Sequence, residues 1–227
     1  MLVSEIFDSI DGEGVRAGML CTFIRLFGCN LRCSYCDSMY AVDKKYTDEP
    51  PKEMTVTEVL AKANRRYRRV TLTGGEPLLF SESVKLVNRL CDNDFEVNIE
   101  TNGSCDIVGF RSLIYNKSNM FFTIDFKLPS SGMMNEMMLS NFTNLRRDDV
   151  LKFVIGTEED CEVAIAYAKK LTEYYGDECP YIYVGTVFGE YDMSDAIERF
   201  MREPELKDVR FQLQLHKFIW DPDARGV

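Results

Sequence analysis

The sequence contains only one histidine, His216, and no uncharged apolar run that approaches the roughly 20 residues of a membrane-spanning helix. Its first residues lack the basic start and the apolar block of a secretory signal. We therefore expect a cytoplasmic chain that does not cross a membrane. Internal repeats, linkers and low-complexity stretches are lacking as well, which predicts a single domain over residues 1–227.

Basic residues are in deficit, because 27 Lys and Arg stand against 37 Asp and Glu and give a net charge of −10. A nucleic-acid site needs a basic stripe, and the one local basic run covers residues 65–69. We interpret this run as the end of a helix, where cations are favoured. The charge therefore argues against a direct nucleic-acid partner.

Short β-rich runs alternate with helical stretches, and this alternation predicts right-handed βαβ units with a parallel sheet. Thr55 and Thr157 each begin a sequence typical of a helix-capping box. The predicted fold is an α/β, trimmed βα barrel, because a full eightfold barrel takes about 250 residues. The expected strands are 20–27, 69–72, 96–99, 120–124, 151–155, 181–184 and 210–215, and the expected helices are 55–67, 81–91, 158–175 and 193–203.

Three of the eight cysteines, Cys29, Cys33 and Cys36, form a C-x3-C-x2-C run after a predicted strand. A structural zinc site would need a fourth ligand, but no second cysteine pair exists and His216 lies far along the chain. A four-iron cluster held by three thiolates fits better and leaves one iron free for the amino and carboxylate groups of S-adenosylmethionine. We expect the five scattered cysteines to be structural.

Polar motifs end three predicted strands: Thr-Gly-Gly-Glu-Pro (73–77), Glu-Thr-Asn-Gly (100–103) and a segment from Asp125 to Gly132. Because barrel enzymes place their sites at the carboxyl ends of the strands, these motifs predict one pocket. Arg25, on an apolar strand, needs an anionic partner, either an internal carboxylate or one on a substrate. Glu13 is either a turn residue or an acceptor for a guanidine-like ring edge. We interpret the methionines at 133, 134, 137 and 138 as packing.

With these motifs, the chain resembles the radical S-adenosylmethionine superfamily and, within it, the 7-carboxy-7-deazaguanine synthase family. The resembling stretches run from FDSIDGEG (7–14) through FIRLFGCNLRCSYCDS (23–38) to the tail LQLHKFIWDPDARGV (213–227). The resemblance implies a radical-mediated ring contraction of 6-carboxy-5,6,7,8-tetrahydropterin to 7-carboxy-7-deazaguanine, with loss of ammonia, in queuosine or archaeosine biosynthesis. It also implies a lyase that uses a [4Fe–4S] cluster, S-adenosylmethionine and Mg²⁺, with a flavodoxin-type electron donor and a homodimeric state.

The resemblance also assigns roles to individual residues. It implies that the cluster is held by Cys29, Cys33 and Cys36, and that Mg²⁺ is bound through Ser38. S-adenosylmethionine would be bound by Tyr35, Cys36, Asp37, Gly75, Glu76, Lys127, Ser130 and Ser131. The pterin would be bound by Ile10, Asp11, Gly12, Glu13, Arg25, Thr73 and Val227, with His216 as a weaker candidate.

Two positions depart from the family's pattern: Ser38 replaces a common threonine, and Asp11 replaces a common glutamine. Serine keeps the oxygen that Mg²⁺ prefers, whereas Asp11 adds charge and removes a donor. An activating enzyme that installs a glycyl radical on a protein partner is the alternative, since it shares the cluster spacing. A zinc or iron–sulfur binding module without enzyme activity is the third interpretation, but it leaves the strand-end motifs unexplained.

Overall fold

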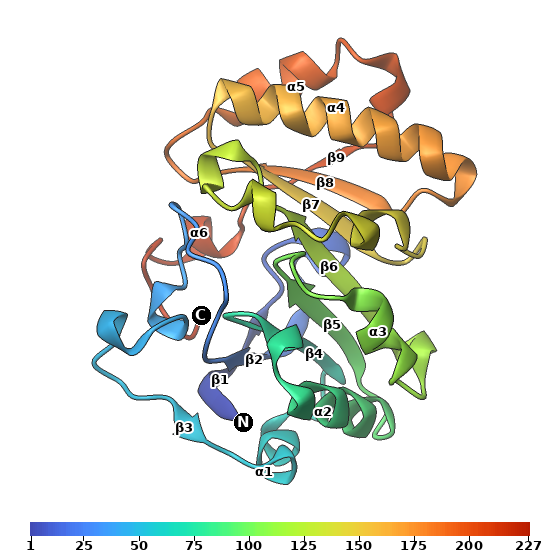
Figure 1. Ribbon diagram of the computed structural model, residues 1–227. Helices are drawn as coiled ribbons and strands as arrows, with labels where there is room; N and C mark the ends of the chain where they lie inside the picture. The colour runs from blue at the N-terminus through green and yellow to red at the C-terminus, as the bar shows by residue number, and fades with distance from the viewer.

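The computed structural model describes residues 1–227 and contains one nine-stranded sheet (Figure 1). The strand order is β3-β1-β2-β4-β5-β6-β7-β8-β9, so the first and last strands do not pair and the barrel stays open. The strands are β1 (Leu2–Ile10), β2 (Leu20–Leu26), β3 (Lys52–Glu53), β4 (Arg69–Gly74), β5 (Glu96–Thr101), β6 (Met120–Phe126), β7 (Val150–Ile155), β8 (Tyr181–Thr186) and β9 (Arg210–Phe211). The helices are α1 (Val56–Lys62), α2 (Ser81–Cys91), α3 (Ile107–Ser112), α4 (Glu158–Tyr175), α5 (Met193–Phe200) and α6 (His216–Ile219). The predicted trimmed barrel is confirmed.

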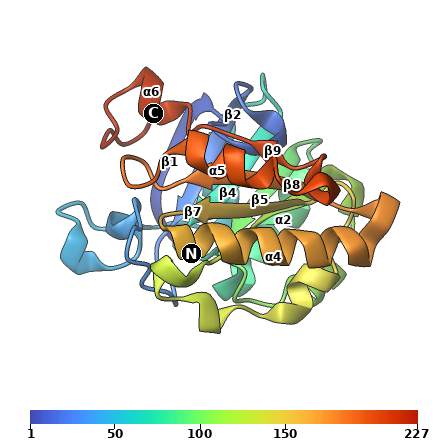
Figure 2. The same ribbon diagram turned by 90° about the horizontal axis from the view of Figure 1, so that it is seen from above.

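Neighbouring strands from β2 through β4 to β9 pair in parallel, while β1 joins β2 and β3 in antiparallel fashion. Helices α2, α3 and α4 lie along the outer side of the sheet, and the red C-terminal segment lies on the opposite side (Figures 1 and 2). Apolar side chains between the sheet and these helices form one core, which includes Leu86, Phe122 and Phe153. None of the helices has the length and apolarity that crossing a bilayer requires.

Helix boundaries follow local capping chemistry. Thr55 accepts from the backbone of Glu58 while the Glu58 carboxylate accepts from Thr55, and Thr157 forms the same capping box with Asp160. Both predicted caps are therefore confirmed. Helices α2 and α4 have their predicted bounds.

The basic run at residues 65–69 does not end a helix, so that interpretation is wrong. Helix α1 already stops at Lys62, and the chain then turns through Arg68, whose φ is +50°. Arg68 forms an exposed ion pair with Asp94, and Arg69 begins β4.

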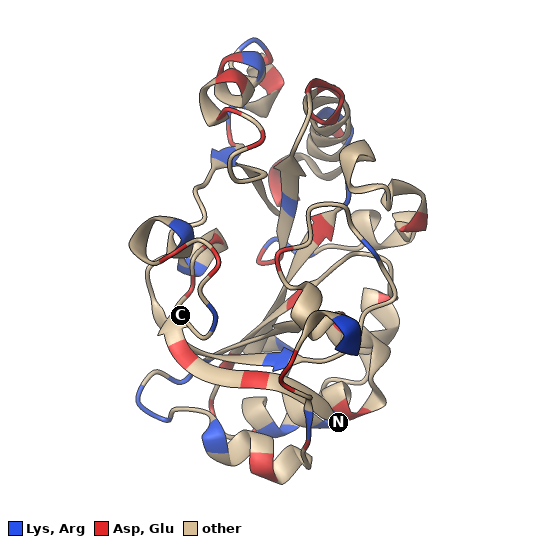
Figure 3. Ribbon diagram, turned by 90° about the vertical axis from the view of Figure 1, so that its left-hand side faces the viewer, with Lys and Arg blue, Asp and Glu red and all other residues tan.

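The sequence also failed to predict β1, a nine-residue strand. Two acidic residues, Glu5 and Asp8, interrupt the apolar alternation expected of a strand, and Figure 3 shows two red bands on the strand that leads from the N-terminus. Glu5 pairs with Arg25, and Asp8 accepts from the Thr22 hydroxyl at 2.6 Å. Tertiary partners on β2 thus stabilise a segment whose own pattern is weak.

No disulfide forms, and all eight cysteines are free thiols. Cys21, Cys91 and Cys161 are buried, in agreement with a structural role. Met133, Met134 and Met137 pack against the core as expected, whereas Met138 is 37% exposed. Two of these sulfurs also accept backbone hydrogen bonds. Met133 Sδ lies 3.4 Å from the Arg32 nitrogen, and Met137 Sδ lies 3.4 Å from the Lys127 nitrogen.

Candidate functional site: a cavity at the carboxyl ends of the strands

One cavity of about 550 Å³ lies on the inner side of the sheet, enclosed by the strand ends, the cysteine loop and the C-terminal tail. Polar side chains of neighbouring strands form the floor of the cavity, because alternate side chains of a strand share a face and the strand register aligns these faces. Arg25 of β2 is paired with Thr73 of β4, and Asp125 of β6 with Lys152 of β7. Most of the residues proposed from the sequence line this cavity: Ile10, Gly12, Glu13, Arg25, Cys29, Cys33, Tyr35, Cys36, Asp37, Ser38, Thr73, Gly75, Lys127 and Val227.

The three cysteines of the loop face this cavity as free, half-buried thiols. Burial raises the pKa of Cys33, and the neighbouring Cys36 and Cys29 raise it further, while Lys127 lowers it. No three His, Cys, Asp or Glu side chains are grouped closely enough to hold one metal ion. A four-iron cluster, in which each cysteine binds its own iron, fits three free thiols presented by one loop.

The cluster loop is fixed against two neighbouring turns. Ser34 donates from its backbone to Ser131 O at 3.1 Å and from its hydroxyl to Ser130 O at 2.7 Å. On the other side, the Glu76 nitrogen donates to Gly28 O at 2.9 Å. A Cβ on Gly75 would lie 1.9 Å from Gly28 O, so only glycine allows this approach.

Opposite charges alternate along one wall of the cavity. Lys152 Nζ lies 2.8 Å from Glu13 Oε2 and 3.2 Å from Asp125 Oδ1, and Lys127 Nζ lies 2.7 Å from Asp125 Oδ2. Burial alone would lower the pKa of Lys152, but Asp125 and Glu13 outweigh it and raise the pKa well above its usual range. Glu13 is thus an ion-paired wall residue and not an exposed turn residue.

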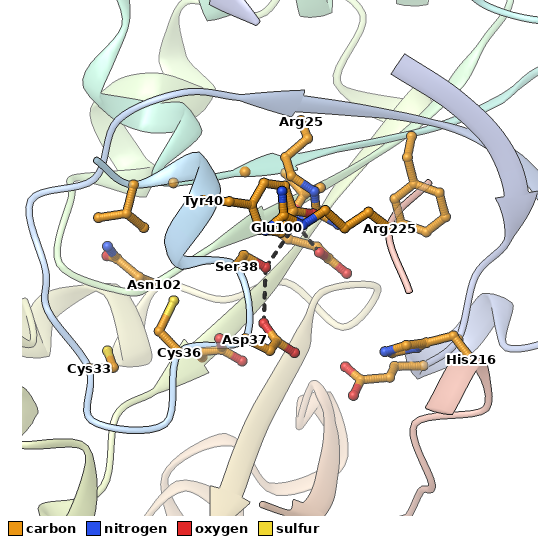
Figure 4. A pocket seen from close by; sticks show the side chains of 18 of the residues that line it. Arg25, Cys33, Cys36, Asp37, Ser38, Tyr40, Glu100, Asn102, His216 and Arg225 are labelled. Atoms are coloured by element: carbon orange, nitrogen blue, oxygen red, sulfur yellow. Dashed lines mark hydrogen bonds between the residues drawn. The ribbon is translucent and has the colours of Figure 1, made fainter. Parts of the chain in front are cut away.

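Arg25 has an internal partner and also faces the cavity. Its Nε lies 2.8 Å from Glu5 Oε1, and its Nη1 donates to the Ser38 hydroxyl at 3.3 Å. Nη2 makes no hydrogen bond within the chain, which leaves a donor edge for a carboxylate ligand. Figure 4 shows Arg25 above Ser38, whose hydroxyl donates in turn to Asp37 Oδ1 at 2.9 Å.

The oxygens of Ser38 and Asp37 are hard ligands of the kind that Mg²⁺ prefers. They lie on the cavity wall directly after the cysteine loop. The chemistry of this pair fits a magnesium ion that keeps most of its waters.

Four proposed residues do not line the cavity, and Asp11 is one of them. Its side chain is 4% exposed, and its carboxylate lies 2.7 Å from Arg16 Nε and accepts from the Thr71 hydroxyl at 2.7 Å. Thr71 lies two residues before Thr73 on the same face of β4, so this network forms a layer beneath the cavity. The Asp11 side chain therefore points away from the cavity, contrary to the expectation that it faces the pterin.

Glu76, Ser130 and Ser131 also have their side chains turned away from the cavity. Glu76 is fully buried and accepts from Leu78 N, Thr101 Oγ1 and Asn102 N. Burial raises its pKa to about 7 even though these donors favour the ionised form. Ser130 donates to Asp160 and Ser131 to Leu128 O, so their hydroxyls hold the turn that supports the cluster loop.

The C-terminal tail closes the far side of the cavity. His216 Nδ1 would lie 2.5 Å from a Cβ on Gly12, so the imidazole packs on a glycine and faces the cavity. The Arg225 guanidinium lies 4.1 Å from the centre of the Tyr40 ring. Figure 4 places Cys33 and Cys36 at one side of this cavity and His216 with Arg225 at the other.

Sequence reasoning missed Lys152 and Tyr40 among the lining residues, whereas Glu100 begins one of the strand-end motifs that were expected to line the pocket. Glu100 is buried in the cavity wall and accepts from the Thr73 hydroxyl at 2.7 Å, and burial raises its pKa. A signal for Lys152 existed, since a lysine in the apolar run VLKFVI poses the same question as Arg25. Tyr40 had no such signal.

Comparison with known proteins places this cavity in a family. Residues 23–113 match the model of the radical SAM superfamily. A 7-carboxy-7-deazaguanine synthase of Clostridium acetobutylicum is 42% identical over 99% of this chain and 98% of its own length. The chain belongs to the 7-carboxy-7-deazaguanine synthase family. A second member, from Chlorobaculum tepidum, is 38% identical over 99% of this chain and 96% of its own length.

The fold agrees with this assignment. The crystal structure of QueE from Escherichia coli superposes with a TM-score of 0.68 and covers 92% of each chain, at 22% identity. Enzymes of the 7-carboxy-7-deazaguanine synthase family use a [4Fe–4S] cluster, S-adenosylmethionine and Mg²⁺. In this chain the cysteine loop offers thiol ligands suited to the cluster, and Asp37 and Ser38 directly after it offer oxygen ligands suited to Mg²⁺.

Proposed function

We propose that this protein is a radical S-adenosylmethionine lyase that converts 6-carboxy-5,6,7,8-tetrahydropterin to 7-carboxy-7-deazaguanine with loss of ammonia, in 7-deazapurine biosynthesis. One observation carries the proposal: a single cavity joins three cluster-type cysteines to Glu13 and Arg25. The family assignment supports the same reaction.

In this proposal the residues divide the cavity between cofactors and substrate. Cys29, Cys33 and Cys36 hold the cluster. S-adenosylmethionine contacts Tyr35, Asp37, Gly75 and Lys127, while the buried Glu76 and the Ser130–Ser131 turn shape its pocket from behind. The chemistry that the bound cofactors supply is a 5′-deoxyadenosyl radical able to abstract a hydrogen atom from the substrate.

The substrate end depends on charge. Glu13, held by Lys152, accepts from the guanidine-like edge of the pterin, and the free Nη2 of Arg25 binds its carboxylate. Ile10, Gly12, Thr73 and Val227 complete the surface around the ring. Ser38 contributes the oxygen that binds Mg²⁺. Fixing the ring in this way supplies the proximity on which hydrogen transfer depends.

The proposal extends to the organisation of the protein. All 227 residues act as one domain, because the tail closes a cavity that begins at β1. We further propose a homodimer, a cytoplasmic location and a flavodoxin-type electron donor. Sedimentation of the reconstituted protein tests the dimer, and replacing dithionite by reduced flavodoxin in the assay below tests the donor.

The decisive experiment is an anaerobic assay of the reconstituted protein. S-adenosylmethionine, a reductant, Mg²⁺ and 6-carboxytetrahydropterin are added, and mass spectrometry follows 7-carboxy-7-deazaguanine. We expect product from the unaltered protein and from Cys179→Ala, which removes a thiol outside the cavity, but none from Cys33→Ala. Formation of 5′-deoxyadenosine without product would contradict the substrate and favour the activation of a protein partner. Absence of both compounds from a protein with a full cluster would contradict the radical reaction.

A further inference from the structure

Asn102 follows β5 and lies in the cavity wall beside the cysteine loop, near Cys33 and Cys36 in Figure 4. Its side chain is 7% exposed. The amide nitrogen Nδ2 lies 3.6 Å from Cys29 Sγ and 3.1 Å from Asn30 Oδ1. Among the three cysteines of the loop, only Cys29 receives a hydrogen bond from a side chain.

The orientation of this amide is determined by its neighbours. Asn102 Oδ1 accepts from the Ser104 backbone N–H at 2.9 Å and from the Ser104 hydroxyl at 2.6 Å. A backbone N–H can only donate, so the oxygen must face Ser104 and the NH₂ group must face Cys29. A flipped amide would lose the hydrogen bond from the Ser104 N–H and the one that it donates to Cys29.

The backbone beneath this amide is equally constrained. The Asn102 nitrogen donates at 2.7 Å to Glu76, whose fully buried carboxylate also accepts from Thr101. Gly103 follows with a φ of +82°, and a Cβ there would lie 2.5 Å from Asp125 O. The donor is therefore fixed in position before any cofactor binds.

We propose that Asn102 is a positioning residue that donates an N–H···S hydrogen bond to the Cys29 thiolate and thereby raises the reduction potential of the cluster. Hydrogen bonds to the sulfurs are among the factors that set the potential of an iron–sulfur cluster. A reduced cluster carries one more negative charge, and a donor at a ligating thiolate stabilises the more negative state. The inference concerns electron transfer into the cluster and does not depend on which substrate is used.

The test compares two variants of the reconstituted protein by redox titration monitored by electron paramagnetic resonance, without S-adenosylmethionine. Asn102→Leu keeps the size of the side chain and removes the donor. Ser104→Ala is the matched control, because it removes a hydroxyl from the same network but keeps the backbone N–H that orients Asn102. We expect the midpoint of Asn102→Leu to become more negative, with about tenfold less reduced cluster at a fixed potential, equivalent to ~59 mV for one electron.

In Ser104→Ala the midpoint should stay where it is in the unaltered protein. An unchanged midpoint in Asn102→Leu with a full cluster, or an equal shift in both variants, would overturn the proposal. If Asn102→Leu does not hold four irons, asparagine labelled with ¹⁵N in its side chain provides a second test. In an Asn30→Ala background, a ¹⁵N coupling to the reduced cluster supports the donor at Asn102, and its absence refutes it.

Discussion

Replacing Gly75 by alanine tests how closely the cluster loop and the Gly-Gly-Glu turn approach each other. The new Cβ would lie 1.9 Å from Gly28 O, 2.3 Å from Gly28 C and 2.9 Å from the Cys29 nitrogen. Ordinary contact begins at 3.4 Å, so backbone atoms would have to separate by about 1.5 Å. Because no flexible side chain can give way, we expect a loss of about 1–3 kcal/mol in the free energy of unfolding.

The larger effect should be on activity, since a displacement of about 1 Å can reduce a rate by about 100-fold. Gly185→Ala is the matched control: its Cβ would lie 3.7 Å from its nearest neighbour, and its φ is not positive. Urea denaturation of the cluster-free proteins measures stability, and iron content with product formation measures the site. If Gly75→Ala were as stable and as active as Gly185→Ala, the close approach would not constrain the site.

Three further outcomes follow from buried charges. Lys152→Met should raise the KM for the pterin about tenfold or more in steady-state assays, because Glu13 loses its ion-pair partner, whereas Lys152→Arg should restore part of the binding. Asp149→Asn should lower the free energy of unfolding, measured by urea denaturation, by about 3–5 kcal/mol, because it leaves the buried Arg111 unpaired. The control Asp94→Asn removes a charge from an exposed pair and should change that free energy by no more than about 0.5 kcal/mol. Equal effects of the two substitutions would contradict the reasoning. Between pH 4.5 and about 7 the native protein keeps a proton on Glu76 that the unfolded chain has released, because burial raises the pKa of Glu76 to about 7. The free energy of unfolding should therefore fall by at most roughly 3 kcal/mol as the pH rises through this range. Urea denaturation at a series of pH values measures this, and an equal dependence on pH in Glu76→Gln would contradict the raised pKa.

Periodicity and capping signals were sufficient to predict the parallel strands of the sheet and the two longest helices, α2 and α4. Their apolar positions face one core, so local pattern and tertiary packing agree. Strand β1 was missed because its acidic residues are satisfied by β2, a partner that no local pattern reveals. Strand β9 is only two residues long, although six were expected.

The same contrast between local sequence signals and tertiary contacts applies to the candidate site. Residue type and spacing identified the cysteine loop, and the strand-end motifs located the cavity. The direction in which a side chain points could not be predicted, as Asp11 shows: it lies between two cavity residues in sequence but turns inward because Arg16 lies beneath the floor. The Glu76 side chain likewise points away from the cavity, and its carboxylate accepts a hydrogen bond from the Asn102 nitrogen.

Met133 and Met137 have a consequence for how the protein ages in air. Each thioether accepts a backbone N–H from a segment that borders the cavity, namely from Arg32 and Lys127. Oxidation would convert these soft, apolar acceptors into bulkier polar sulfoxides. Where a two-electron oxidant such as peroxide reaches either thioether, the resulting sulfoxide is damage that iron and sulfide do not repair, and its reversal requires a methionine sulfoxide reductase.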